Sequence, residues 1–186
     1  MLTREFEIFI ESERDLPLNI FSLNEELNSY DYGIIINGKR VTKNIDFRNY
    51  KTIPVNLFKR YKCGVCWDFV NYEAYWFRKR GYKFKTYYIV IDNNKECPTH
   101  TFLVFQLNGK SYYFESSWFT YQGIRVFNTD KDAIKFVLNN HRNADKEYLQ
   151  YPYYIYEYDT TGMDNYLSPI EFMTKIATEG KEIKGL

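Results

Sequence analysis

The most regular hydrophobic pattern of the chain follows Cys66. From Trp67 to Arg80, apolar residues recur at the spacing expected for one face of an amphipathic helix. These apolar positions are Phe69, Val70, Ala74 and Phe77. The last turn is basic, which complements the helix dipole, and Gly81 follows as a C-terminal cap. The pattern therefore predicts a helix of about four turns that begins at Cys66.

Segments rich in Tyr, Ile, Val and Thr follow this helix and predict strands. Tyr82 to Asp92 is the first of these segments. Thr99 to Leu107 and Lys110 to Ser116 are the next two, and the Asn108-Gly109 pair between them is typical of a two-residue hairpin turn. We therefore expect an antiparallel hairpin in this part of the chain.

The remaining elements have weaker signals. Before Cys66, the sequence favours a helix over Asn24 to Tyr30 and a hairpin made of Ile34 to Ile36, the turn Asn37-Gly38, and Arg40 to Thr42. After the central hairpin, it predicts a helix over Asp130 to Asn140, a strand over Tyr153 to Tyr158, and a helix from the capping box Ser168-Pro169-Ile170-Glu171 to Gly180. This order of helices and strands predicts an α+β fold.

Length and composition favour one domain spanning residues 1–186. A chain of 186 residues, of which 45% are apolar, is long enough to bury a core. No internal repeat and no stretch rich in Gly, Ser or Pro divides it.

Charge and cysteine usage narrow the functional classes. Lys and Arg total 25 against 24 for Asp and Glu, so the net charge of +1 gives no field to attract nucleic acid or anionic lipid. The longest apolar runs, such as Thr101 to Leu107, are too short to span a membrane, and Arg4, Glu5 and Glu7 interrupt any signal-peptide stretch. Three cysteines make no disulfide framework and fit a reducing compartment, so we expect a cytoplasmic protein.

Cys66 is the candidate nucleophile. A cysteine becomes nucleophilic when its thiolate is stabilised, and the free amides and positive dipole end of a helix N-terminus provide that stabilisation. Gly64 is expected to let the backbone turn tightly into the helix. The amide of Cys66 would then be free to help hold an oxyanion.

His100 and Glu115 are the candidate base and the acid that orients it. Of the two histidines, His141 lies in a polar stretch, whereas His100 begins an apolar strand. If the two-residue turn pairs Leu107 with Lys110, His100 and Glu115 become diagonal neighbours on one face of the hairpin. A carboxylate there would fix the histidine tautomer and stabilise an imidazolium.

Two other interpretations of this pair remain open. A lone histidine on a strand is commonly a structural residue, and Glu115 on an edge strand can face solvent. A three-residue turn would also shift the register and separate the two side chains.

With these residues identified, the chain resembles the transglutaminase-like superfamily of papain-like folds. The resemblance rests on three motifs, and it covers a core of about residues 55–125. The motifs are Gly64-Val65-Cys66-Trp67, Thr99-His100-Thr101 and Phe114-Glu115-Ser116-Ser117-Trp118. Tyr32-Gly33, Gly123-Ile124 and Tyr156-Glu157-Tyr158 are similar to bacterial members. The family usually has Asp where this chain has Glu115, and often an aromatic residue where it has Thr101.

The resemblance implies a nucleophile helix packed on an antiparallel sheet, with Cys66, His100 and Glu115 as the catalytic residues. Family enzymes attack an amide carbonyl, form a thioester and pass the acyl group to water or an amine. A peptidase, deamidase or transglutaminase acting on a protein or peptide is therefore expected, with no cofactor and no metal. An upstream side chain supplies the second oxyanion donor; Tyr61 and Asn56 are candidates, and neither is assigned.

Other functional classes also fit parts of the sequence. Cys63, Cys66, Cys97 and His100 have the spacing of a zinc ribbon. Cys63 and Cys66 also match a thioredoxin-like disulfide exchanger, in which Cys63 would attack and Cys66 would resolve. The third alternative is an inactive family member that serves as a binding scaffold.

Overall fold

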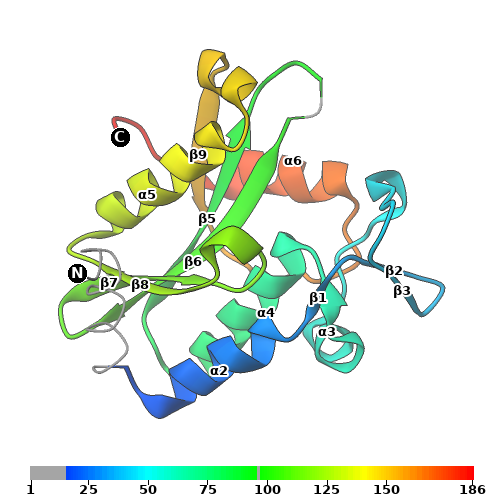
Figure 1. Cartoon of the computed structure of the whole chain (residues 1–186), viewed down its shortest axis with the longest axis horizontal. Coiled ribbons are helices and arrows are strands. Elements are labelled where there is room, and N and C mark those ends of the chain that lie inside the picture. The colour runs from blue at the N-terminus through cyan, green and yellow to red at the C-terminus, as the bar shows by residue number, and fades with distance from the viewer. Residues whose placement is uncertain (1–15, 96) are drawn as a thin grey trace, which may run out of the picture.

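The computed structural model describes residues 16–95 and 97–186 (Figure 1). The expectation about a signal peptide at Arg4, Glu5 and Glu7 lies outside these residues. The fold is a mixture of helices and strands built on a six-stranded antiparallel sheet, which is compatible with the predicted α+β class.

The central sheet has the strand order β10-β9-β5-β6-β7-β8. Its strands are β5 (Phe84–Ile91), β6 (Thr99–Leu107), β7 (Lys110–Glu115), β8 (Gly123–Phe127), β9 (Tyr153–Tyr158) and β10 (Lys181–Glu182). Two smaller pairs precede it: β1 (Asp31–Tyr32) with β4 (Cys63–Gly64), and β2 (Ile34–Ile36) with β3 (Lys39–Val41).

The helices surround this sheet. The α-helices are α2 (Leu18–Asn28), α3 (Val55–Tyr61), α4 (Cys66–Lys79), α5 (Asp130–Asn143) and α6 (Pro169–Glu179). Three short 3-10 helices are η1 (Phe47–Asn49), η2 (Phe119–Tyr121) and η3 (Lys146–Gln150).

Most of the predicted elements are confirmed. Helix α4 begins at Cys66, β6 and β9 have the predicted bounds, and Ser168 and Glu171 form the capping box of α6. The pairing of Leu107 with Lys110 is also confirmed, so the hairpin has the predicted register. The first helix differs, because α2 begins six residues before Asn24, directly after Pro17, and buries Ile20 as well as Leu23 and Leu27.

Helices cover both faces of the sheet (Figure 1). Side chains alternate along β6, so that Leu103 and Phe105 lie in one core cluster with Phe77 of α4. Phe102 and Val104 lie in another cluster with residues of α5. The sheet is therefore buried on both sides, with α4 on one face and α5 on the other.

A parallel bridge joins a distant segment to the start of α4. Strand β1 pairs with β4, with Tyr32 opposite Gly64. The N–H of Asp31 donates to the carbonyl of Lys62, and that of Gly33 donates to the carbonyl of Gly64, both at 2.9 Å. These bonds place Tyr32 directly beside the chain that leads into Cys66.

Asp68 fixes the first turn of α4. Its carboxylate accepts hydrogen bonds from the N–H groups of Val65 and Ile53, each at 3.0 Å. Burial raises the pKa of Asp68 to about 7, although these two donors act in the opposite direction. The start of the helix, and with it Cys66, is held to the segment before α3.

Gly64 is required for close packing rather than for a turn. A Cβ atom there would lie 2.7 Å from Cβ of Asp68 and 2.8 Å from Cε2 of Phe58. The backbone of Gly64 is not in the left-handed region, so the expectation of a glycine-dependent tight turn was wrong. The missing side chain instead lets β4 approach the first turn of α4.

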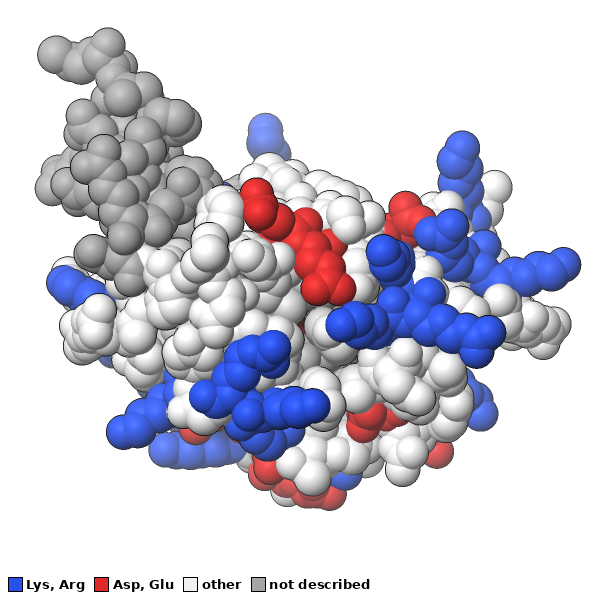
Figure 2. Space-filling view, turned by 90° about the horizontal axis from the view of Figure 1, so that it is seen from below, with Lys and Arg blue, Asp and Glu red and all other residues white. Residues whose placement is uncertain are grey.

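The face seen in Figure 2 has a mixed charge. Lys and Arg side chains gather there in separate groups, divided by acidic and uncharged residues. Among residues 16–95 and 97–186, no helix has both the length and the apolar character needed to cross a membrane.

We predict that Gly64→Ala destabilises the fold by about 2 kcal/mol, because the new methyl group overlaps atoms that cannot easily move. Gly109→Ala is the control: Gly109 has a φ of +74° but nothing within 4 Å of its added Cβ, so about 1 kcal/mol of backbone strain is expected. Urea unfolding measures both free energies. A cost for Gly64→Ala no larger than that for Gly109→Ala would contradict the packing explanation.

Candidate active site

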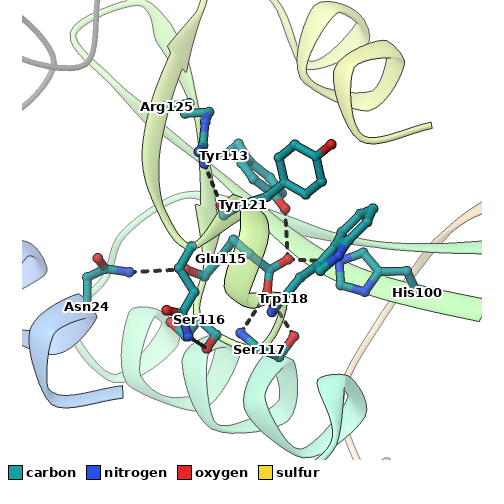
Figure 3. A network of polar contacts seen from close by, with 10 residues as sticks. Asn24, His100, Tyr113, Glu115, Ser116, Ser117, Trp118, Tyr121 and Arg125 are labelled. Atoms are coloured by element: carbon teal, nitrogen blue, oxygen red, sulfur yellow. Dashed lines mark hydrogen bonds and ion pairs between the residues drawn. The ribbon is translucent and has the colours of Figure 1, made fainter. Parts of the chain in front are cut away.

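The carboxylate of Glu115, at the end of β7, is the centre of a buried polar network (Figure 3). Its Oε2 lies 2.8 Å from Nε2 of His100 and accepts a hydrogen bond from the Tyr113 hydroxyl at 2.8 Å. Its Oε1 accepts from the N–H and hydroxyl of Ser117, both at 2.7 Å, and from the N–H of Trp118 at 2.9 Å. Both carboxylate oxygens are therefore fixed in position.

These partners keep Glu115 ionised although it is only 2% exposed. Burial alone would raise its pKa, but the charge of His100 and the hydrogen bonds from His100, Ser117 and Tyr113 lower it below the ordinary value. Glu115 is thus a buried anion whose charge is balanced by an imidazolium.

His100 faces this carboxylate from the start of β6. Burial would lower its pKa, but the Glu115 charge and hydrogen bonds with Cys66 and Glu115 outweigh burial and raise it. An ionised carboxylate only accepts hydrogen bonds, so Nε2–H of His100 donates to Glu115. The other ring nitrogen, Nδ1, is left for Cys66.

The end of β7 explains how His100 reaches Cys66 at the start of a helix. The pairs between β6 and β7 run from Leu103↔Phe114 to Leu107↔Lys110, so His100 lies beyond them. After Glu115 the chain leaves the sheet through Ser116 and Ser117. Beyond the β6–β7 pairs, the imidazole of His100 hydrogen-bonds Cys66, the first residue of α4.

Tyr32 completes the site, although the sequence did not assign it. The backbone N–H of Cys66 hydrogen-bonds the Tyr32 hydroxyl, while burial raises the pKa of Tyr32 well above its ordinary value. The hydroxyl is therefore a neutral donor beside the Cys66 amide. An oxygen that displaced this bond would accept from both the N–H and the hydroxyl.

The two suggested oxyanion donors lie elsewhere. Asn56 is exposed near the start of α3, and the Tyr61 hydroxyl lies near the β2–β3 turn, at 3.4 Å from where a Cβ of Gly38 would be. The only signal for Tyr32 was the Tyr32-Gly33 pair in the family resemblance. The position of Tyr32 depends on the β1–β4 bridge, which no local sequence pattern predicts.

A hollow of about 420 Å³ opens over these groups. It is lined by Tyr32, Cys66 and His100, by residues 117–120, by Pro98 and Thr99, and by residues from the end of α5 and from η3. The thiol of Cys66 is free and faces a space large enough for part of a substrate.

His141 also lines this hollow, which the sequence did not indicate. The predicted helix ended at Asn140, but α5 continues to Asn143 and carries His141 into the interior. Its ring lies 6.2 Å from that of His100. Burial, and then the charge of His100, lower the pKa of His141 to about 4, so the ring is neutral at neutral pH.

The geometry does not favour the metal or disulfide-exchange alternatives. Within the described part of the chain, no group of three or more His, Cys, Asp or Glu residues is arranged to hold a metal ion, so Cys63, Cys66, Cys97 and His100 do not form a zinc site. Cys63 is fully buried in β4, and burial raises its pKa to about 11. Such a thiol is a poor attacking group for disulfide exchange.

Comparisons of the chain with protein-family models, with curated proteins and with solved structures found no match.

We predict that Glu115→Gln lowers the free energy of unfolding by about 3 kcal/mol near pH 5.5, because it leaves a buried imidazolium without its anion. Glu115, whose pKa is lowered below its ordinary value of 4.5, stabilises the fold above pH 4.5, and this contribution is lost as the pH falls toward the lowered pKa. His100, whose pKa is raised above its ordinary value of 6.5, stabilises the fold below pH 6.5, and this contribution is lost as the pH rises toward the raised pKa. The difference in free energy of unfolding between the wild type and Glu115→Gln should therefore be largest between about pH 4.5 and 6.5 and decrease below and above that range.

Tyr113→Phe is the matched control, because it removes one hydrogen bond to Glu115 and leaves the charge pair in place. It should cost about 1 kcal/mol with little change across the same pH range. Urea unfolding at several pH values measures both variants. A Glu115→Gln effect that does not vary with pH would contradict the ion pair.

Proposed function

We propose that this chain is a cysteine-dependent acyl-transfer enzyme that acts on amide bonds through a thioester, of the transglutaminase-like, papain-like type that its motifs resemble. The observation that carries the proposal is the buried His100–Glu115 pair, 2.8 Å apart, beside a free thiol at a helix start. A nucleophile, a base and a group that orients the base are the parts that acyl transfer needs.

In the proposed reaction, Cys66 and His100 react as a thiolate–imidazolium pair, and the thiolate sulfur attacks the carbonyl carbon of an amide. In the free protein the Cys66 N–H donates to the Tyr32 oxygen. As negative charge develops on the carbonyl oxygen, that oxygen displaces this bond and accepts from both the Cys66 N–H and the Tyr32 hydroxyl. As the C–N bond breaks, the imidazolium of His100 protonates the departing amine. The acyl group remains on Cys66 as a thioester.

In the second half, water or an amine attacks the thioester while His100 accepts its proton. The bond to sulfur breaks, and the sulfur leaves as a thiolate beside the imidazolium. Glu115 remains ionised throughout, because its five hydrogen-bonding contacts favour the anion. It orients His100 and stabilises the positive charge that forms there.

Glu115 suits this role although the family usually has Asp. Its extra methylene lets one oxygen reach His100 while the other accepts the backbone N–H groups of Ser117 and Trp118. The departure of the chain at the end of β7 provides these donors. An aspartate at this position would be too short to contact both His100 and the backbone N–H groups of Ser117 and Trp118.

The first test is alkylation of the three cysteines by iodoacetamide across pH, mapped by mass spectrometry. We expect Cys66 to react rapidly near pH 6, where an ordinary thiol with a pKa of about 8.5 is almost unreactive. His100→Ala should slow this reaction about tenfold or more, because the imidazolium no longer stabilises the thiolate. Cys97, which is partly exposed, serves as the internal reference and should not change.

A rate at Cys66 no higher than that at Cys97, in wild-type protein of intact fold, would end the proposal. Protection of Cys66 that is released by a chelator would favour metal binding, and dominant reactivity of Cys63 would favour disulfide exchange. In a peptide amide assay, Cys66→Ala and His100→Ala should abolish turnover, and Glu115→Gln should reduce it less severely.

A second test addresses Tyr32. We predict that Tyr32→Phe slows acylation of Cys66 by p-nitrophenyl acetate about a hundredfold, because one oxyanion donor is lost. Alkylation by iodoacetamide forms no oxyanion and should be slowed far less. Tyr61→Phe is the control, since Tyr61 does not line the hollow. Equal slowing of acylation and alkylation would show that Tyr32 acts on the thiol rather than on the oxyanion.

A further inference from the structure

The hollow over Cys66 has an aromatic wall beyond the reacting groups. We call Trp118, Phe119 and Tyr148 the aryl wall, since all three line the hollow and come from the segment after β7 and from η3. None of the lining residues in the described part of the chain is Lys, Arg, Asp or Glu. Apart from Cys66 and His100, which react as a thiolate–imidazolium pair, the lining is therefore uncharged, and its large side chains are aromatic.

Trp118 is fixed by the catalytic network itself. Its backbone N–H donates to Glu115, and its ring packs edge-on against that of His100, with centroids 5.0 Å apart. Its ring also contacts Tyr121 at 4.6 Å. The aryl wall is thus held at a fixed position next to His100.

Phe119 is the most exposed part of the wall. Its side chain is 63% exposed, although the neighbouring rings are packed. A large apolar side chain left in water beside a nucleophile gains stability when a ligand covers it. An aromatic ligand gains further, because aromatic rings attract one another beyond the effect of buried area.

The second imidazole in the hollow adds to this selectivity. His141 approaches the carbonyl of Pro98 with its Nε2 at 3.4 Å. Burial and the nearby charge of His100 keep its pKa low, so it presents a neutral ring. Among the lining residues of the described part of the chain, no Asp or Glu is present to pair with a cationic group packed on the wall, which disfavours cationic ligands there.

We infer that the acyl donor of this enzyme carries an uncharged aromatic group that packs against the aryl wall while its carbonyl carbon lies at Cys66. This inference rests on the proposed function and deepens it by naming the substrate class. The donor is an aromatic acyl group or a peptide segment with an aromatic side chain next to the reacting amide. A cationic side chain at that place is rejected.

The test compares haloacetamides that share one electrophile and differ in their tail. The reagents are iodoacetamide, N-benzyliodoacetamide, N-(cyclohexylmethyl)iodoacetamide and N-(2-aminoethyl)iodoacetamide. Each rate at Cys66 is divided by the rate of the same reagent with glutathione, which removes intrinsic reactivity. We expect the benzyl reagent to be favoured about tenfold over iodoacetamide, the cyclohexyl reagent less, and the cationic reagent to be disfavoured.

Phe119→Ala should bring the ratio for the benzyl reagent down toward that of the cyclohexyl reagent. Phe47→Ala is the matched control, because Phe47 is 48% exposed in η1 and does not line the hollow, and it should leave every ratio unchanged. A wild-type benzyl ratio near one, a preference for the cationic reagent, or no effect of Phe119→Ala would overturn the inference.

Failure of the proposed function is distinguishable from failure of this inference. If the function fails, Cys66 reacts slowly with all four reagents near pH 6; if only the inference fails, it reacts rapidly without preference. In the first case, N-benzylacetamide and its cyclohexylmethyl analogue are compared on Cys66→Ala protein by saturation-transfer NMR. Selective binding of the benzyl compound that is lost in Cys66→Ala/Phe119→Ala supports the aryl wall, and equal or absent binding overturns it.

Discussion

The structure around the candidate site depends on one buried negative charge. Removing a carboxylate from water is costly unless a positive charge and several donors replace the water. Glu115 obtains these partners from β6, from its own strand and from the segment that follows it. Satisfying this one group therefore fixes the end of β7, the ring of His100 and the position of Trp118 together.

The same charge connects stability with chemistry. The Glu115 anion, held by five contacts, raises the pKa of His100 and so favours an imidazolium beside Cys66, which is the charge state that the proposed chemistry requires. Helix α4 supplies the other half of the candidate site, because its first residue carries the sulfur and its backbone N–H hydrogen-bonds the Tyr32 hydroxyl. The sheet thus holds the His100–Glu115 pair, and the helix start holds the thiol.

Local patterns predicted the parts of this arrangement that are close in sequence. The Asn108-Gly109 turn fixed the register that makes His100 and Glu115 neighbours, and helical spacing placed Cys66 at a helix start. Tyr32 was missed because a two-residue parallel bridge to a distant segment leaves no periodic signal. His141 was missed because tertiary packing extends α5 past a polar stretch that reads as a loop.

The β1–β4 bridge holds Tyr32 less firmly than the central sheet holds His100 and Glu115. His100 and Glu115 belong to a six-stranded sheet, whereas Tyr32 is attached beside Cys66 through a strand of two residues. Short pairings of this kind open locally at a lower free energy than central strands. Local opening of residues 31–33 would therefore move the Tyr32 hydroxyl away from the Cys66 amide while the thiol and the His100 imidazole stay together.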